Sequence, residues 1–186
     1  MSSLITKGNA SGTGSVTLES PNTNSDFTIT LPAATGTAMV SGNIPAFSAY
    51  MSANQAPTNN ALVKCAVDTE VFDTANCFNT SNYRFTPNVA GYYQINGSVA
   101  GYSTGTSLTA SATIIQKNGS TVAAAQINGS SSFLLLQPTI TQIVYLNGST
   151  DYVELYGLVV ASGGSQLFVG TSLLYTTFSG CLVRAA

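Results

Sequence analysis

The stretch that decides the fold runs from Asp73 to Gly97 and reads DTANCFNTSNYRFTPNVAGYYQING. It opens with small and polar residues of the kind that form loops. A short strand centred on Phe85 follows, and residues 87–91, which begin with proline and end with glycine, predict a turn. The sequence therefore predicts a loop, a short strand, a turn and the start of a longer strand.

The longer strand has a different kind of side chain on each of its faces. Successive side chains of a strand point to opposite faces, so every second residue shares a face. One face is expected to hold Tyr93, Ile95 and Val99, and the other to hold Tyr92, Gln94 and Asn96. We expect the aromatic side chains of the first set to lie in the core.

The remainder of the chain repeats this alternation of apolar and polar residues. The runs span residues 108–116, 122–127, 133–146, 152–160 and 167–182. Asn118-Gly119 and Asn147-Gly148 lie between runs, and Asn-Gly readily adopts the positive φ angles that a tight hairpin requires. No segment of the sequence combines helical periodicity with helix caps. We therefore predict an all-β fold.

The composition indicates a folded chain with an unusually uncharged surface. The chain has 186 residues, enough for one well-buried domain with a small appendage. It is 44% hydrophobic and only 6% charged, whereas a typical soluble domain has about 25% charged residues. Because hydrophobic residues are plentiful and the net charge is only -2, the low charge does not indicate disorder. We interpret it as a surface covered largely by further copies of the same chain.

Several classes of protein are excluded. No run reaches the roughly 18 apolar residues of a membrane-spanning helix, and the N-terminus lacks the apolar core of a signal peptide. We therefore expect a protein that folds in a cytoplasm and has no membrane partner. The five basic residues are scattered singly, so we expect no nucleic acid partner.

The three cysteines, Cys65, Cys77 and Cys181, are odd in number and lack metal-type spacing, and they are expected to be reduced thiols.

The first 43 residues form a segment of their own. Residues 1–12 are small and polar and are expected to form an arm that becomes ordered on docking. Residues 15–18 and 27–31 alternate around a turn-rich segment, which predicts a β-hairpin, and residues 38–40 are candidates for a short third strand. A two-stranded hairpin is marginal alone in water, so its partner surface must lie elsewhere.

A head domain is predicted from Ile44 to the C-terminus at Ala186. Residues 44–51 combine small and aromatic residues and predict its first strand. Val63, Cys65 and Val67 alternate with polar or small residues and predict a second strand.

The residues that usually carry catalysis are largely missing. The sequence contains no histidine, which excludes Ser-His-Asp triads, Cys-His pairs and histidine-ligated metal sites. We predict no catalytic residue and no cofactor. Asp68, Glu70 and Asp73 lie close together and could supply oxygen ligands to a calcium ion. Because the spacing of a calcium-binding loop is absent, we interpret them as solvated loop carboxylates, with Asp73 capping a turn.

The opening stretch resembles the signature of the complement C1q globular head. The matching residues are Asp73, Phe78, Phe85, Gly91, Tyr93 and Ile95, and residues 177–183, with Phe178 and Gly180, resemble the closing strand of that family. The chain departs from the pattern at Val67, Ile95 and Gly97, where the family usually has aromatic residues. The resemblance covers residues 44–186. It implies a ten-stranded jelly-roll β-sandwich, shared with the tumour-necrosis-factor cytokines, that assembles as a homotrimer.

A second resemblance precedes the head. The segments GSVTL at residues 14–18 and TLPAATGT at residues 30–37 are similar to a short module common in bacteriophage virion proteins. In those proteins the module stands ahead of a fibre or decoration domain. The resemblance implies a phage structural protein whose residues 1–43 dock it to the particle.

Three runs of the head are apolar on both faces of their strands. They are residues 133–136, 155–160 and 172–175. One face can fill the core and the other needs a partner, which supports a trimer that buries the second faces along its axis. Loops that cover these faces are the alternative. The predicted interface residues are Leu134, Leu136, Tyr156, Leu158, Leu173 and Tyr175.

Together these inferences predict a non-enzymatic homotrimer on the surface of a bacteriophage virion, assembled in the host cytoplasm. Only an arm and a hairpin precede the head, which favours a capsid decoration (cement) protein or short head spike over a long fibre. Its partner would then be the major capsid protein. The alternative is the receptor-binding tip of a tail or short fibre, attached to tail proteins and recognising a host surface glycan or protein.

Overall fold

The protein is described from a computed structural model. The structure describes residues 44–105, 108–129, 133–171 and 175–186 and, nearer the N-terminus, residues 8, 10–15, 17, 19, 21–26, 28 and 30. Within these residues all regular secondary structure is β-strand, which confirms the predicted all-β class. The chain divides into two units, residues 1–37 and residues 38–186.

The predicted N-terminal hairpin is not seen at the positions that the structure describes. Residues 15, 17, 28 and 30 belong to the two predicted strands, and none of them is in a strand. The other hairpin positions, and the candidate strand at residues 38–40, lie outside the described residues.

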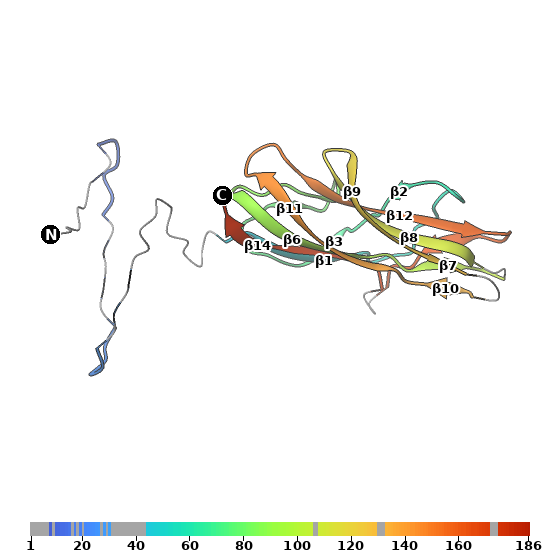
Figure 1. The fold of residues 1–186 in the computed structure, drawn as a ribbon, viewed down its shortest axis with the longest axis horizontal. Coiled ribbons are helices and arrows are strands. Elements are labelled where there is room, and N and C mark those ends of the chain that lie inside the picture. Colours follow the sequence, from blue (N-terminus) through green and yellow to red (C-terminus); the bar gives the residue numbers. More distant parts are fainter. Residues whose placement is uncertain are drawn as a thin grey trace. The chain divides into compact units, whose positions relative to one another are not determined.

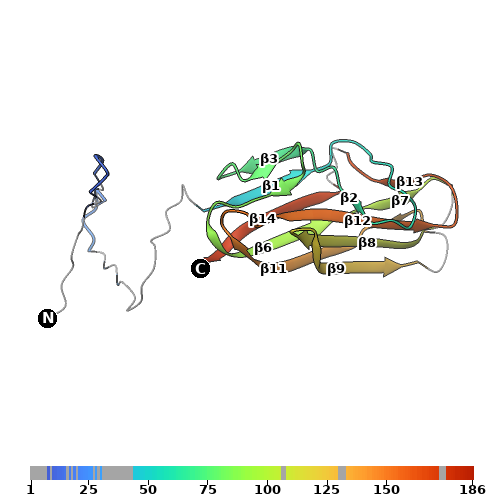
Figure 2. The ribbon, with the colours of Figure 1, turned by 90° about the horizontal axis from the view of Figure 1, so that it is seen from above.

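The head consists of antiparallel strands in two layers, as Figures 1 and 2 show. The strands are β1 (Ala46–Tyr50), β2 (Val63–Lys64), β3 (Thr69–Asp73), β4 (Phe78–Asn79), β5 (Arg84–Phe85), β6 (Ala90–Ser98), β7 (Gly101–Ser103), β8 (Leu108–Lys117), β9 (Ser120–Asn128), β10 (Leu135–Leu136), β11 (Thr139–Asn147), β12 (Val153–Ala161), β13 (Gln166–Phe168) and β14 (Thr177–Ala185).

The layers are named here after their central strands. The β6 sheet has the order β11-β6-β14-β1-β3, and the β12 sheet has the order β4-β5-β12-β8-β9, with β2 also pairing with β12. A short β7 sheet, of order β10-β7-β13, lies at the end away from the C-terminus (Figure 1). Both predicted early strands are present, although the second covers only Val63–Lys64. The layers form the predicted jelly-roll sandwich.

Three long stretches of chain bend where they pass between the β6 sheet and the β7 sheet. The stretches β6–β7, β10–β11 and β13–β14 are each interrupted there, so residues 133–146 and 167–182 are not single strands as predicted. In the first of these two runs the interruption contains Pro138, which has no N–H to donate to a ladder. Buried side chains then take over hydrogen bonds that the ladder would have supplied.

Thr113 and Thr176 supply these substitute hydrogen bonds. The Thr113 hydroxyl donates to the carbonyl oxygen of Pro138 at 2.6 Å and accepts from the backbone N–H of Val99 at 3.0 Å. The Thr176 hydroxyl accepts from the backbone N–H of Ala100 at 3.2 Å. Both threonines are fully buried, so these bonds satisfy backbone groups that water cannot reach.

The aromatic residues of the opening stretch form the core at the end of the head near the C-terminus. The Phe47 ring stacks on Phe78 and Phe85 at centroid distances of 5.0 and 4.3 Å and meets the edge of Phe178 at 5.1 Å. Phe85 in turn meets Tyr93 at 5.6 Å. Tyr93, Ile95 and Val99 are all fully buried, as the alternation predicts.

Tyr93 also ties the core to the preceding turn. Its hydroxyl donates a 2.6 Å hydrogen bond to the carbonyl oxygen of Val89, so the buried phenol is satisfied. Burial is the main reason that the pKa of Tyr93 is raised above the ordinary tyrosine value.

Two glycines of the predicted signature allow strands to approach closely. A Cβ at Gly91 would meet the carbonyl oxygen of Arg184, and a Cβ at Gly180 would lie 2.7 Å from the Cδ1 atom of Ile95. A larger residue at Gly91 would push β14 away from β6, because its Cβ atom would meet the backbone, whereas at Gly180 the end of the Ile95 side chain would have to move.

The two Asn-Gly pairs behave differently. Asn118 and Gly119 have φ angles of 50° and 79° and join the paired strands β8 and β9, as a tight hairpin turn requires. The prediction of a hairpin at Asn147-Gly148 is wrong, because β11 belongs to the β6 sheet and β12 to the β12 sheet. There the Asn147 side-chain oxygen accepts backbone N–H groups of the following residues, including Asp151 at 2.9 Å, and caps a loop that crosses between layers.

Candidate assembly face

The outward surface of four strands of the β6 sheet, β11, β6, β14 and β1, is almost free of charge, whereas the edge strand β3 carries Glu70 and Asp73. None of β1, β6 and β11 contains an Asp, Glu, Lys or Arg, and β14 contains only Arg184 near its end. A typical soluble domain has about a quarter of its residues charged, and most of those lie on the surface. These four strands therefore present an unusually neutral surface, which we call the β6 face.

A row of polar side chains crosses the middle of the β6 face. Strand register places Ser48 opposite Ser179, Ser179 opposite Asn96, and Asn96 opposite Thr141. The Asn96 side-chain oxygen accepts hydrogen bonds from the Thr141 hydroxyl at 2.9 Å and from the Gln94 amide at 3.3 Å. Because much of the row is satisfied within one protomer, a partner could cover it at little cost in unpaired polar groups.

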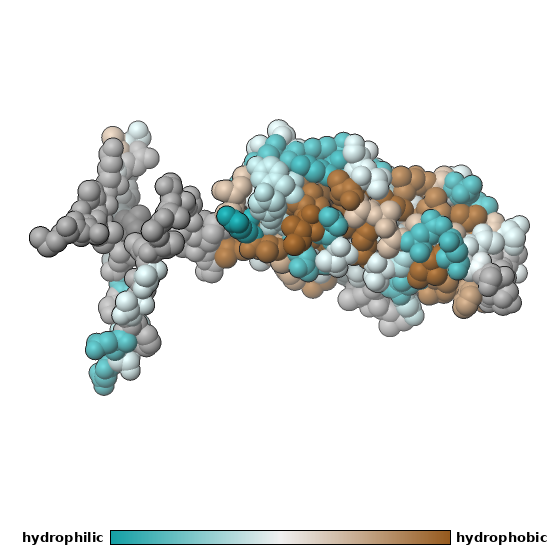
Figure 3. All heavy atoms as spheres, in the orientation of Figure 1, coloured by the Kyte–Doolittle hydropathy of each residue, from teal (hydrophilic) through white to brown (hydrophobic). Residues whose placement is uncertain are grey.

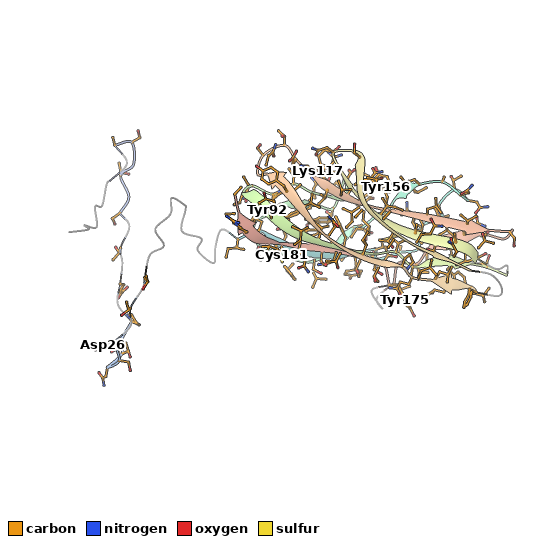
Figure 4. The ribbon with its side chains drawn as sticks, in the orientation of Figure 1. Asp26, Tyr92, Lys117, Tyr156, Tyr175 and Cys181 are labelled. Atoms are coloured by element: carbon orange, nitrogen blue, oxygen red, sulfur yellow. The ribbon has the colours of Figure 1, made fainter. Side chains whose placement is uncertain are left out.

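Apolar and aromatic residues gather at the end of the β6 face near the C-terminus. Tyr92 and Tyr145 lie opposite each other on β6 and β11, with ring centroids 5.5 Å apart and an interplanar angle of 60°. Tyr92, Tyr145, Ile143 and Val183 are 45%, 42%, 56% and 55% exposed. Figure 4 marks Tyr92, together with Cys181 of β14, on the β6 layer. These side chains would gain most from a partner surface.

A second neutral surface is the side of the sandwich where β9 and β11 lie. Each is the outermost strand of its sheet, each has nine residues, and neither contains a charged residue. Val122 and Ile127 of β9 are partly exposed, and Figure 3 shows hydrophobic residues gathered on this side. Long uncharged edge strands invite pairing with other chains unless something covers them. We call this surface the β9–β11 side.

The six predicted interface residues do not share one surface. Leu134 is exposed, Tyr175 is half-buried, and Tyr156 and Leu158 are half-buried on β12, in the other layer (Figure 4). Leu173 lies outside the described residues. The choice of Leu136 is wrong, because this side chain is buried in the protomer's own core.

Sequence reasoning missed the apolar residues of the β6 face, which are Tyr92, Ile143, Tyr145 and Val183. A signal was available, because the alternation assigned Tyr92 to the face opposite the core. Runs of consecutive apolar residues do not mark this face, because it is built from single residues on strands far apart in sequence. Only the register between β6 and β11 brings Tyr92 and Tyr145 together.

A group of charged residues clamps one end of the β12 sheet. The Glu154 carboxylate is 2% exposed and accepts from Lys64 Nζ at 2.7 Å and from Arg84 Nη2 at 2.9 Å. The Arg84 guanidinium also lies 3.5 Å from the centroid of the Tyr152 ring. Burial, followed by the negative charge of Glu154, raises the pKa of Tyr156 beside it. Lys64, Arg84 and Glu154 form ion pairs with one another, so we interpret this cluster of charged residues as structural.

The three carboxylates weighed as calcium ligands are not brought together. Asp68 accepts from the backbone N–H and the hydroxyl of Ser52 at 2.9 and 2.7 Å, whereas Glu70 is exposed. Asp73 caps a turn, as predicted, by accepting from the backbone N–H of Phe78 at 2.7 Å. Within the described part of the chain no three Asp, Glu, Cys or His side chains are placed to hold a metal ion.

The cysteines are all free thiols. Cys65 and Cys77 are buried and Cys181 is exposed on β14. Burial is the main reason that the pKa values of Cys65 and Cys77 are raised, which keeps these two thiols in their unreactive form.

Among the described residues, no helix is long and apolar enough to cross a membrane.

Comparison with solved structures identifies the fold. The globular domain of the zebrafish complement 1qA protein aligns with a TM-score of 0.55 and 15% identity over 76% of this chain and 99% of that domain. Murine APRIL, in a crystal structure at pH 5.0, aligns with a TM-score of 0.56 and 10% identity over 75% of this chain and 99% of its own. No family model and no curated protein sequence matches the chain. The chain therefore has the jelly-roll fold of C1q and tumour-necrosis-factor heads.

Proposed function

We propose that the chain is a non-enzymatic structural protein that acts as a homotrimer. The observation that carries this proposal is the β6 face, a nearly uncharged sheet surface with four partly exposed apolar side chains. A monomer would leave this surface in water, whereas an oligomer removes it. The fold shared with C1q and tumour-necrosis-factor heads supports three as the number of protomers.

The positions of the two neutral surfaces support a closed ring. The β6 face and the β9–β11 side are different surfaces of one protomer, so joining the side of one copy to the face of the next is a head-to-tail contact. Such contacts close into a ring when the rotation between copies allows it. A ring would also cover the edges of β9 and β11, which are otherwise open to pairing.

The particle that we propose for this trimer is a bacteriophage virion. The support is the similarity of residues 14–18 and 30–37 to a module of phage virion proteins. We propose a capsid decoration protein or short head spike that docks through its N-terminal segment to the major capsid protein. The head would then lie on the virion surface after assembly in the host cytoplasm. The missing histidine supports a role without catalysis.

The second candidate is the receptor-binding tip of a tail or short fibre. The observation that favours it is the free end of the head, where Phe133, Leu134 and Leu135 are consecutive and all exposed. These residues precede and enter β10, at the end of the sandwich away from the C-terminus (Figure 1). Exposed apolar residues at a free end are suited to contact a partner, here a host surface glycan or protein.

Light scattering on the purified full chain tests the trimer. We expect a mass close to three times the 19.1 kDa of the chain. Tyr145→Lys or Ile143→Lys would place a charge on the β6 face and is expected to shift the mass toward the monomer. Leu62→Lys is the matched control. Leu62 is 43% exposed, directly precedes β2, which pairs with β12, and lies outside both neutral surfaces. A monomeric wild-type protein at micromolar concentration would refute the trimer.

Copy number separates the two virion roles. Quantitative gel analysis of purified particles is expected to give hundreds of copies for a capsid decoration protein. A few copies to a few dozen would instead support the tail role. A density map of the intact particle would locate the head directly.

A further inference from the structure

A polar hollow lies on the side of the head away from the β9–β11 side. Its volume is about 290 Å³, and it is lined by Asn76, Cys77, Phe78, Asn79, Asn82 and Thr86. These residues belong to β4, to the loops on either side of it and to the position after β5, and β4 is the edge of the β12 sheet opposite β9. A ring built from the β6 face and the β9–β11 side would therefore leave this hollow open.

One wall of the hollow, formed by residues 75–78 and Thr86, is fixed by hydrogen bonds within the protein. The Asp73 carboxylate accepts from the backbone N–H groups of Ala75 at 3.2 Å and Phe78 at 2.7 Å. The backbone N–H of Thr86 donates to the carbonyl oxygen of Cys77 at 2.8 Å and joins the two ends of the loop. A ligand would not have to order this backbone on binding, which lowers the cost of association.

The second wall is equally fixed. The Asn79 side-chain oxygen accepts from the backbone N–H groups of Ser81 at 2.8 Å and Asn82 at 3.2 Å, which closes a tight turn. Lys64 Nζ donates to the carbonyl oxygen of Asn82 at 3.0 Å. The backbone that carries Asn82 is therefore anchored to β2.

Several polar side chains of the hollow have hydrogen-bonding capacity to spare. The amide groups of Asn76 and Asn82 and the hydroxyl of Thr86 make no hydrogen bond to the residues that the structure describes. The Asn79 oxygen is used by its turn, but its NH₂ group is not. Each free amide can both donate and accept, as can the hydroxyl.

The lining also selects the charge of a ligand. No Lys, Arg, Asp or Glu lines the hollow, and the nearby Asp73 carboxylate is engaged by backbone N–H groups. The nearby Lys64 ammonium is engaged by the Glu154 carboxylate and the Asn82 carbonyl oxygen, so an anion would find no unpaired cation there. An apolar molecule would strip water from the amides without replacing its hydrogen bonds. The hydroxyl groups of an uncharged molecule can donate to the acceptors of the hollow and accept from its donors.

We propose that this hollow binds one unit of a neutral saccharide through Asn76, Asn82 and Thr86. Its volume is just below the roughly 300 Å³ at which small-molecule pockets begin, so it takes a single sugar unit and leaves the rest of a glycan in solvent. Affinity is expected on the order of 1 mM, because an open hollow buries only part of the sugar. The inference adds a saccharide site apart from the free end that the second candidate function uses, and it does not depend on the trimer.

Saturation-transfer-difference NMR on the full chain tests the site. The probes are glucose, galactose, mannose and N-acetylglucosamine, each offered separately, with glucose 6-phosphate as a charged counterpart. We expect transfer to at least one neutral sugar and weaker transfer to the phosphate. Absence of transfer to all four neutral sugars, or stronger transfer to glucose 6-phosphate than to glucose, would overturn the proposal.

Variants then place the binding site. Asn76→Gly, which tolerates the φ angle of 54° at this position, and Asn82→Ala are each expected to weaken binding about tenfold, the effect of one lost hydrogen bond. Asn128→Ala, at an exposed position on β9, is the control and should bind as the wild type does. Unchanged binding in both hollow variants would put the sugar elsewhere and refute the assignment. Light scattering on the same samples reports the trimer separately, so the two proposals fail independently.

Discussion

The Thr113 hydroxyl donates a 2.6 Å hydrogen bond to the carbonyl oxygen of Pro138, and through it β8 of one layer holds the bend that leads into β11 of the other. The Thr113 hydroxyl oxygen itself accepts from the backbone N–H of Val99, where the chain leaves β6. A single hydroxyl therefore satisfies backbone groups of two interrupted strands. Together with the Thr176 hydroxyl, which accepts from the backbone N–H of Ala100, it satisfies buried backbone groups where the strands are interrupted.

Replacing this hydroxyl by a methyl group should destabilise the head. Thr113→Val keeps the shape of the side chain but leaves the Val99 N–H and the Pro138 oxygen without this partner. We expect a loss of roughly 1–3 kcal/mol in the free energy of unfolding, the usual cost of an unsatisfied buried group. Urea unfolding at one fixed protein concentration measures it. Thr121→Val, at an exposed position of β9, is the control and should change stability little.

Ser111 should respond in the opposite direction. Its hydroxyl is fully buried on β8, and it has no hydrogen-bond partner among the described residues. Ser111→Ala removes a desolvated polar atom, so we expect the free energy of unfolding, measured with urea, to stay level or rise by up to about 1 kcal/mol. Ser103→Ala, which removes a buried hydroxyl that donates to Gly163, should lower the midpoint. A loss of stability in Ser111→Ala would show that this hydroxyl has a partner.

Glu154 should matter far more than an exposed carboxylate. Glu154→Gln leaves Lys64 and Arg84 without their shared counter-charge at the junction of β2, β5 and β12. Since the two cations are 29% and 32% exposed, water compensates in part, and we expect a loss of about 2 kcal/mol. Glu70→Gln is the matched control and should cost less than about 0.5 kcal/mol. Equal losses in both variants would contradict the clamp.

Acid should weaken the head in part through Asp151. The hydrogen bond from Lys117, followed by that from Asn118, lowers the pKa of Asp151 below its ordinary value of 3.8. The pKa of Asp68 is also lowered, because hydrogen bonds from Ser52 outweigh the opposing effect of burial. A carboxylate whose pKa is lower in the folded state stabilises the fold above its unfolded pKa, and this stabilisation is lost as the pH falls through the folded pKa.

The pH dependence can be measured directly. We expect the urea midpoint to fall as the pH drops below about 4, and we expect a shallower fall in Asp151→Asn than in the wild type. Glu70→Gln should retain the wild-type slope. An identical slope in the wild type and in Asp151→Asn would show that this carboxyl does not contribute.

The features that the sequence predicts well are local. Phe78, Phe85 and Tyr93 are in the core, as predicted. This could be predicted because the alternation of a strand and the position of a turn can be recognised from a few neighbouring residues. The Asn118-Gly119 turn follows for the same reason, since two residues with positive φ are enough to specify it. Both predictions depend on neighbouring residues alone and require no information about distant strands.

The predictions that failed depend on partners far away in sequence. Asn147-Gly148 has the local chemistry of a hairpin, but β11 and β12 each pair with strands from elsewhere in the chain. Leu136 was placed on an outer face because the bend at Pro138 was not foreseen. The β6 face was missed because Tyr92 and Tyr145 are ordinary surface residues until register places them side by side.

Cys181 gives the head a chemical reporter of its own association. It lies on the β6 face, in register with Ala46 and Gln94, and it is exposed, whereas Cys65 and Cys77 are buried. A neighbour that covers the β6 face also covers this thiol. The rate at which the unmodified protein reacts with a thiol reagent therefore measures the fraction of free protomers, with no label added and no residue changed.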